Sequence, residues 1–221
     1  QGIEEFVGDH QHRAIGRHGR QIVVPLRAGH GYQLDVLERG RAFDEVDRRR
    51  KALAEQAARL IHTSNLYQVR EQERLSDKLA EYSGMAEAFF CNSGCEANEA
   101  AIKLARLYGH GKGIEQPAII VMEKAFHGRT LATLSATGNR KVQAGFEPLV
   151  TGFVRVPFDD LAAVESVARH NANVVAVLFE PIQGEGGIRL AHDEYMQGLR
   201  NICSANDWLF MVDEVQCGIG R

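Results

Sequence analysis

Acidic and amide side chains follow directly after an apolar run near the end of this 221-residue sequence. The run Trp208–Val212 leads into Asp213, and Gln216 stands shortly after it. In a parallel α/β sheet, ligands bind outside the carboxyl ends of the strands, so these polar groups would face a crevice and not the core. The same pattern also occurs where an acid only caps the next helix or binds a metal ion. Asp213 and Gln216 are therefore candidate ligand-binding residues, with those two roles as alternatives.

A candidate phosphate site precedes a helical pattern in the middle of the chain. Residues 88–91 predict a short buried strand, and Ser93 with Glu96 matches a capping box, so a helix should begin near Gly94. The free N–H groups and positive dipole at that point favour a phosphate, which Gly94 would let approach the backbone. An ordinary capped helix without a ligand is the alternative. The apolar spacing places one set of residues on the buried face: Ala97, Ala101, Leu104, Ala105 and Tyr108.

A third group of functional side chains follows the apolar run 118–122, which predicts a strand. Phe126, His127 and Arg129 lie together in the segment after it. An aromatic ring, an imidazole and a guanidinium could stack on a planar ligand and pair with a carboxylate. A lone Phe-His pair would more often be packing. Three strand ends that carry groups compatible with a phosphate, a ring and a carboxylate are harder to explain by packing alone.

The elements that must position these residues alternate between strand and helix patterns. Strands are expected at 118–122, 152–156, 174–179 and 209–212, and helices at 161–170 and from about 193 to 206. That alternation implies an α/β fold, with a mainly parallel sheet and helices on both faces. Nearer the N-terminus, residues 29–44 are expected to form a hairpin with Gly40 in its turn, and the helix that follows would hold Leu53, Ala57, Leu60 and Ile61.

Four segments together resemble the class III aminotransferases, which use pyridoxal 5′-phosphate. They are residues 92–99, 126–129, 180–187 and 213–216, and the resemblance runs nearly continuously from about residue 52 to residue 221. It implies that 52–221 form part of the large cofactor-binding domain of a fold-type I enzyme, preceded by an atypical segment at 1–51. Residues 62–67 and 136–139 look most like members that move an amino group between N-acetylornithine and 2-oxoglutarate in arginine biosynthesis. Succinylornithine, ornithine and 4-aminobutyrate are alternative substrates.

The resemblance implies a role in cofactor binding for several residues. Asp213 would pair with the pyridinium nitrogen and keep the ring an electron sink. Gln216 would bind the phenolic oxygen, while Val215 and Phe126 would pack on opposite faces of the ring. His127 belongs to the same loop and is assigned to the cofactor as well.

The phosphate and the substrate have their own candidate residues by the same resemblance. Ser93, Gly94 and Cys95 would hold the phosphate, with Cys95 where the family usually has Thr or Ala. Arg129 would bind the substrate α-carboxylate through two parallel hydrogen bonds. Two further residues complete the set: Glu185, which would help exchange the two substrates, and Glu180, which would support the cofactor from behind.

The resemblance also implies groups that these 221 residues do not contain. The family's Schiff-base lysine is expected downstream of Arg221, so no catalytic residue is assigned here and the chain is interpreted as an inactive fragment. The complete protein is expected to be a homodimer. The alternative from a different functional class is a non-catalytic α/β protein that binds partner chains or anionic ligands through the same strand ends.

The composition is ordinary for a globular cytoplasmic chain, with 44% hydrophobic residues and a net charge of −3. Acids beside the one basic cluster, 48–51, favour a solvated helix over a nucleic-acid site. The four cysteines lack metal-ligand spacing, so free thiols in a reducing compartment are expected. Metal binding by the N-terminal histidines lacks fixed ligand spacing too. There is no run long enough to span a membrane and no apolar signal-peptide core.

Overall fold

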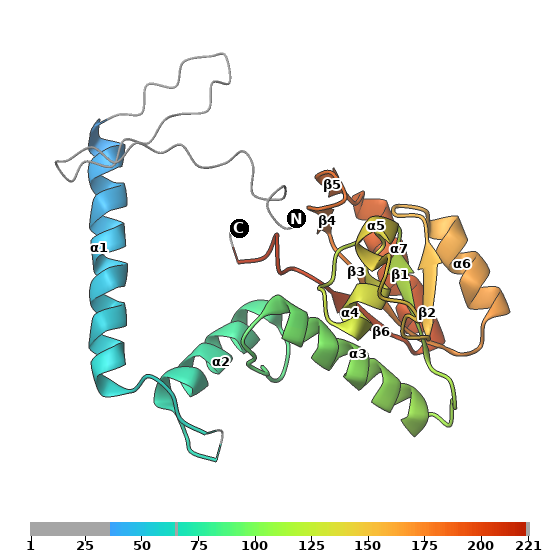
Figure 1. Cartoon of the computed structure of the whole chain (residues 1–221), viewed down its shortest axis with the longest axis horizontal. Coiled ribbons are helices and arrows are strands. Elements are labelled where there is room, and N and C mark those ends of the chain that lie inside the picture. Colours follow the sequence, from blue (N-terminus) through green and yellow to red (C-terminus); the bar gives the residue numbers. More distant parts are fainter. Residues whose placement is uncertain (1–35, 65, 220–221) are drawn as a thin grey trace, which may run out of the picture. The chain divides into compact units, whose positions relative to one another are not determined.

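The computed structural model describes residues 36–64 and 66–219 of the chain (Figure 1). It divides into two compact units, Gln1–Val69 and Arg70–Arg221. The N-terminal histidines at positions 10, 12, 18 and 30, whose spacing does not favour a metal site, lie outside the described residues. The boundary expected between residues 51 and 52 stays a prediction.

The described residues of the first unit contain one long helix, α1 (Val36–Arg59). Its surface carries ion pairs one turn apart, such as Arg48 and Arg49 with Glu45, each at 2.8 Å. Pairs at this spacing favour the helix over an extended chain. The hairpin expected at 29–44 is therefore wrong from residue 36 onward, because Gly40 lies inside α1; residues 29–35 lie outside the described part. The apolar positions are not buried either, since Leu53 is 72% exposed.

The second unit is built on a four-stranded parallel sheet in the order β2-β1-β3-β6. The strands are β1 (Ala118–Met122), β2 (Phe153–Val156), β3 (Val174–Phe179) and β6 (Leu209–Val212). The chain places β2 on one side of β1 and then returns to place β3 on the other. That reversal opens a crevice at the carboxyl ends of β1 and β3, which is where α/β sheets bind ligands.

Helices cover both faces of this sheet (Figure 1). They are α3 (Gly94–Gly111) with the short α4 (Leu131–Ala136) on one face, and α6 (Leu161–His170) with α7 (Asp193–Asn206) on the other. Because side chains alternate along a strand, Ile119 and Val121 pack toward α3, while Ile120 and Met122 pack toward α6 and α7. Every residue of β1 and β3 is buried, as expected for strands covered on both sides.

Four further elements complete the second unit. They are α2 (Arg70–Ser83), in which no residue is buried, α5 (Arg140–Gln143), and the antiparallel pair β4 (Ile182–Gln183) and β5 (Arg189–Leu190). The pair β4–β5 shapes the glycine-containing segment after β3. The sequence patterns described above did not predict any of the four.

The expected α/β architecture is confirmed, and β1, β3, β6, α6 and α7 occupy the predicted residues. The short buried strand expected at 88–91 is wrong. No pairing of that segment occurs within the described residues, and Phe89 is 75% exposed. An apolar run becomes a strand only when a neighbour completes its hydrogen bonds, and the run alone does not reveal that neighbour.

The buried face of α3 differs from the one expected. Its buried residues are Asn98, Ile102, Ala105 and Gly109, whereas Leu104 is 60% exposed. Gly109 explains the rotation, because a Cβ at that position would lie 2.7 Å from Pro117 and 2.8 Å from Val175. The helix therefore approaches the sheet along its small residues. As a consequence, the amide of Asn98 faces inward.

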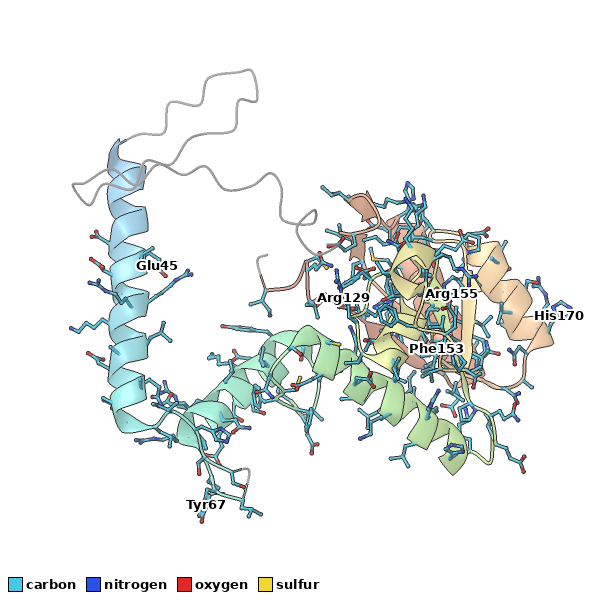
Figure 2. The ribbon with its side chains drawn as sticks, in the orientation of Figure 1. Glu45, Tyr67, Arg129, Phe153, Arg155 and His170 are labelled. Atoms are coloured by element: carbon cyan, nitrogen blue, oxygen red, sulfur yellow. The ribbon has the colours of Figure 1, made fainter. Side chains whose placement is uncertain are left out.

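Arg155 lies on β2 (Figure 2), and its hydrogen bonds fix the loop that ends α4. Its Nη2 donates hydrogen bonds to the carbonyl oxygens of Ser135 and Thr137, both at 2.9 Å, and of Ala136 at 3.2 Å. These carbonyls close a helix C-terminus, where a cation is favourable. Arg155 thus holds the α4 end beside the sheet edge, and Thr137 in that loop in turn supports the β1–α4 segment.

Candidate functional site

Asp213 lies at the centre of the candidate site, directly after β6. Its backbone N–H donates to the carbonyl oxygen of Phe179 at 2.8 Å, which extends the sheet by one residue. The residue is 7% exposed. Its Oδ2 accepts hydrogen bonds from His127 Nδ1 and Asn98 Nδ2, each at 2.8 Å, and its Oδ1 accepts from the Val215 N–H at 3.1 Å. A buried carboxylate with three donors is held in one orientation.

The same contacts decide the charge of Asp213. Burial alone raises the pKa of a carboxyl group, but the hydrogen bonds from His127, Asn98 and the Val215 N–H outweigh burial and lower the pKa of Asp213 below its ordinary value. The group is therefore ionised at neutral pH although almost no solvent reaches it. A buried, fixed negative charge of this kind suits a cationic ring nitrogen.

The segment between β1 and α4 contributes the neighbouring side chains. His127 is fully buried against Asp213, and its backbone N–H donates to Thr137 Oγ1 at 3.0 Å. Phe126 is half-buried, and its N–H donates to Glu180 Oε2 at 3.0 Å. Arg129 is exposed at the end of the segment (Figure 2). His127 thus contacts Asp213 from the buried side, while Phe126 and Arg129 are accessible to a ligand.

Glu180, at the carboxyl end of β3, carries a second buried carboxyl group with the opposite tendency. It is 2% exposed. Burial raises the pKa of Glu180 to about 7, and the hydrogen bond from the Phe126 N–H and the nearby His127 only partly oppose that rise. The pKa of Asp213 is thus lowered while the pKa of the neighbouring Glu180 is raised. Opposite pKa shifts of neighbouring acids are typical of functional sites.

We expect Glu180→Gln to change how stability depends on pH. The folded chain binds the Glu180 proton more tightly than the unfolded chain, because the pKa rises from 4.5 to about 7 on folding. The stability that this proton provides is complete below pH 4.5 and is lost as the pH rises to about 7. Glutamine stays neutral, so urea unfolding should find the variant about 3 kcal/mol more stable relative to wild type at pH 8 than at pH 4.5. Equal pH profiles would contradict the assignment.

The N-terminus of α3 provides the candidate anion site. The Glu96 N–H donates to Ser93 Oγ at 3.2 Å, so the predicted cap is present. The returning bond reaches the N–H of Asn92, at 2.6 Å, and not that of Ser93. The N–H groups of Gly94 and Cys95 occupy the first positions of the helix, which the helix itself does not satisfy. They are available to a phosphate.

The Cys95 thiol lies between these N–H groups and the next loop. Its Sγ is 3.3 Å from Thr133 Oγ1 and 3.5 Å from Thr130 Oγ1. Burial opposes ionisation of the thiol, yet hydrogen bonds from Thr130, Thr133 and the backbone lower the pKa of Cys95 to about 7. Gly128, with φ 130°, makes room for the sulfur, since a Cβ there would lie 2.6 Å from Sγ. This contact joins the α3 N-terminus to the Phe126–Arg129 segment.

Val215 and Gln216 bring the segment after β6 to the same place. A Cβ on Gly94 would lie 2.6 Å from both methyl carbons of Val215. A Cβ on Gly184, after β4, would lie 2.5 Å from Gln216 Oε1. Both Val215 and Gln216 are exposed. The residues predicted to hold one cofactor therefore do converge, although they come from four separate parts of the sequence.

A cleft of about 330 Å³ opens beside Phe126. Arg129 and Glu185, which were predicted to bind the substrate, both line it. The other charged residues of its lining are basic, namely Lys124, Arg140 and Lys141. Four cations and one acid favour an anionic ligand such as a carboxylate.

Two positioning residues were missed in the sequence. Asn98 and Thr137 hold Asp213 and His127, respectively, yet each looks like an ordinary polar residue in or after a helix. The only available signal for Asn98 was its one-residue offset from the expected apolar face. Among the described residues no group of three or more His, Cys, Asp or Glu side chains could hold a metal ion, and no described helix is long and apolar enough to cross a membrane.

Comparison with known proteins shows the family to which this chain is related. The sequence model of the aminotransferase class-III family matches residues 46–221. The acetylornithine aminotransferase of Nitrosomonas europaea is 67% identical over 171 residues, which are 77% of this chain and 44% of that protein. Acetylornithine aminotransferase 1 of Bordetella pertussis is 55% identical over 170 residues, again 77% of this chain and 43% of the relative.

Solved structures agree with this likeness. The ornithine aminotransferase of Toxoplasma gondii superimposes with a TM-score of 0.73 at 31% identity, covering 76% of this chain and 41% of its own. The N-acetylornithine aminotransferase of Stenotrophomonas maltophilia gives 0.63 at 36% identity, covering 77% and 42%. The chain thus spans less than half the length of these relatives. From its motifs, its parallel sheet and these relatives, the chain belongs to the class III aminotransferases.

Proposed function

We propose that this chain is the cofactor-binding part of a pyridoxal-phosphate-dependent aminotransferase that exchanges an amino group between N-acetylornithine and 2-oxoglutarate, in arginine biosynthesis. The observation that carries the proposal is the buried Asp213, which stays ionised at the carboxyl end of β6. The names of the acetylornithine aminotransferases from Nitrosomonas europaea and Bordetella pertussis support the choice of substrate.

The residues of this chain fit pyridoxal phosphate. When bound, this cofactor supplies an electron sink for the carbanion of an amino-acid substrate. Asp213 would accept a hydrogen bond from the protonated ring nitrogen. The first N–H groups of α3, at Gly94 and Cys95, would bind the phosphate. Phe126 and Val215 would pack on the two ring faces. His127 would act from behind Asp213, through the hydrogen bond from Nδ1, and not on the ring itself.

The other predicted residues fall into supporting and substrate-binding roles. Glu180 accepts a hydrogen bond from the Phe126 N–H and so fixes the loop whose Phe126 would stack on the ring. Gln216 would bind the phenolic oxygen, and Ser93 caps the helix that carries the phosphate site. In the cleft, the Arg129 guanidinium would bind the substrate α-carboxylate, since it offers paired donors to a planar anion. Glu185 is the acid that could neutralise this arginine when no carboxylate is present.

Cofactor binding can be tested with pyridoxamine 5′-phosphate, which carries no aldehyde and so cannot attach to surface lysines. Calorimetry with this chain should show one site, and pyridoxamine without the phosphate should bind at least tenfold more weakly, because it cannot use the α3 N-terminus. Absence of any saturable binding, or equal binding of the two compounds, would contradict the proposal. The expected homodimer and cytoplasmic location stay predictions, and so does the inactivity of the chain by itself.

We expect Arg129→Lys to weaken substrate binding while cofactor affinity changes little. Lysine keeps the charge but loses the planar pair of donors. Because Arg129 is exposed, the loss should be modest, about 5- to 30-fold in the dissociation constant of 2-oxoglutarate measured by calorimetry with the cofactor-loaded chain. Arg169→Lys on α6 is the matched control and should bind as wild type does. A fall in cofactor affinity with unchanged 2-oxoglutarate binding would instead assign Arg129 to the phosphate.

One observation favours ornithine as a second candidate substrate. A solved structure to which this chain is similar, with a TM-score of 0.73 at 31% identity, is the ornithine aminotransferase of Toxoplasma gondii. Competition between ornithine and N-acetylornithine for the cofactor-loaded chain separates the two. Tighter binding of N-acetylornithine is the expected result.

A further inference from the structure

Asn98 is a polar residue buried at a position where asparagine is otherwise unfavourable. It lies inside α3 with 6% exposure. Asparagine is a weak helix former, and a buried amide without partners is costly. Its Nδ2 donates to the carbonyl oxygen of His127 at 2.9 Å and to Asp213 Oδ2 at 2.8 Å. Two acceptors for the two N–H hydrogens leave this amide one orientation.

These two hydrogen bonds connect three segments that converge at the site. Asn98 comes from α3, His127 from the β1–α4 segment and Asp213 from the end of β6. The bond to the His127 carbonyl fixes the backbone from which the imidazole reaches Asp213. The bond to Oδ2 acts on the carboxylate directly. Asn98 is therefore one of the two donors to Oδ2, and it also fixes the backbone that carries the other donor, His127.

The three hydrogen bonds that Asp213 accepts leave one acceptor position of its carboxylate free. Oδ2 accepts from Asn98 and His127, and Oδ1 accepts only from the Val215 N–H, at 3.1 Å. A carboxylate oxygen can accept two hydrogen bonds, so the second acceptor position of Oδ1 remains. The donors on Oδ2 also prevent a proton from residing there, because a protonated Oδ2 would face two donors with a hydrogen of its own.

We propose that Asn98 is a positioning residue, which holds Asp213 ionised and presents Oδ1 to the protonated ring nitrogen of the cofactor. This inference rests on the function proposed above. It assigns to Asn98 a role through Asp213 and no contact with the cofactor. Three titratable groups interact electrostatically with Asp213: His127, Glu180 at the end of β3 and Cys217 after β6. Asn98 is the side-chain donor to Asp213 that does not titrate.

The test compares Asn98→Leu, Asn98→Asp and the wild-type chain. Leucine has a similar volume and removes the donor, while aspartate keeps the shape and places an acid beside Oδ2. The titration midpoint of the Asp213 carboxyl carbon, followed by ¹³C NMR without cofactor, should rise by about one pH unit in Asn98→Leu, the size expected for one lost hydrogen bond to a charged group. In Asn98→Asp the two acids should titrate as a coupled pair, with one midpoint raised further.

Affinity for pyridoxamine 5′-phosphate provides the second readout. The acidic limb of its pH profile should move upward by the same unit in Asn98→Leu, with about a tenfold loss of affinity on that limb. Asn201→Leu, at an exposed position of α7, is the control and should change neither readout. Far-ultraviolet circular dichroism identifies a variant that fails to fold, in which case Asn98→Asp decides.

The outcomes separate this inference from the proposed function. An unchanged Asp213 midpoint in a folded Asn98 variant overturns the positioning role, even if affinity falls, because affinity can fall through packing alone. If Asp213→Asn abolishes binding while Asn98→Leu does not shift the profile, the proposed function stands and the role of Asn98 is wrong. If the wild-type chain binds no pyridoxamine phosphate, the proposed function fails, and with it the ligand that Asn98 is inferred to serve.

Discussion

Asp213→Asn is expected to lower the affinity of the chain for pyridoxamine 5′-phosphate by about two orders of magnitude at pH 7. The aspartate is buried and ionised, so it can offset the charge of a protonated ring nitrogen without competition from water. Removing one partner of a buried, hydrogen-bonded charge pair costs on the order of 2–5 kcal/mol. Asparagine also places an N–H₂ group toward either the Val215 N–H or the donors on the other oxygen, which adds a donor–donor conflict.

The measurement is calorimetric titration of folded wild-type and variant chains. Asp207→Asn is the matched control, because Asp207 has a 79% exposed side chain that pairs with Lys112. The control should bind the ligand as wild type does. Similar affinities for Asp213→Asn and Asp207→Asn would mean that the carboxylate after β6 does not meet the ring nitrogen, and the proposed function would lose the observation that carries it.

Phe179→Ala is expected to reduce the free energy of unfolding by about 3–5 kcal/mol. Phe179 is the last residue of β3 and is 1% exposed. Its ring lies 5.3 Å from that of Phe210 and 6.5 Å, edge to face, from that of Tyr195, so truncation would empty the contact between the sheet and α7. Losses of this size are a large part of the stability of an ordinary domain.

Urea unfolding followed by the fluorescence of Trp208 would measure this loss, since Trp208 is the single tryptophan and packs against the same core. Phe89→Ala is the control, because Phe89 is 75% exposed and its removal should change stability by about 0.5 kcal/mol or less. If Phe179→Ala unfolds completely, Phe179→Leu should still show about 1 kcal/mol of destabilisation. A change in Phe179→Ala no larger than in the control would contradict the core assignment.

The sequence was sufficient to predict the sheet because its central strands are buried on both faces. Ala118–Met122 and Val174–Phe179 are unbroken apolar runs, and burial at every position requires such runs. The helices 161–170 and 193–206 were predictable because each buries a single apolar stripe against the sheet. The face of α3 was misjudged because its burial depends on the small Gly109 and not on the large Leu104. Pattern analysis gives weight to large apolar residues and none to the space that glycine leaves.

The site was predictable where side chains follow strands and unpredictable where partners lie elsewhere in the chain. The placement of Asp213 after an apolar run follows from the rule that ligands bind at the carboxyl ends of parallel strands. That His127 lies behind Asp213, and that Asn98 meets both, depends on the rotation of α3 and the course of the β1–α4 segment. Neither can be read from spacing along the sequence, because each contact is made between distant segments.

The wide separation of these partners has a consequence for the order in which the protein is made. His127 and Asp213 are 86 residues apart, and Asn98 and Asp213 are 115 apart. At a ribosomal rate of roughly 5–20 residues per second, the imidazole is synthesised about 4–17 seconds before its carboxylate. Until then β1 and β3 can pair, but the side chains of Asn98 and His127 lack the carboxylate oxygen that accepts their hydrogen bonds. Under the proposed function, the buried carboxylate for the ring nitrogen exists only once the residues directly after β6 have been synthesised.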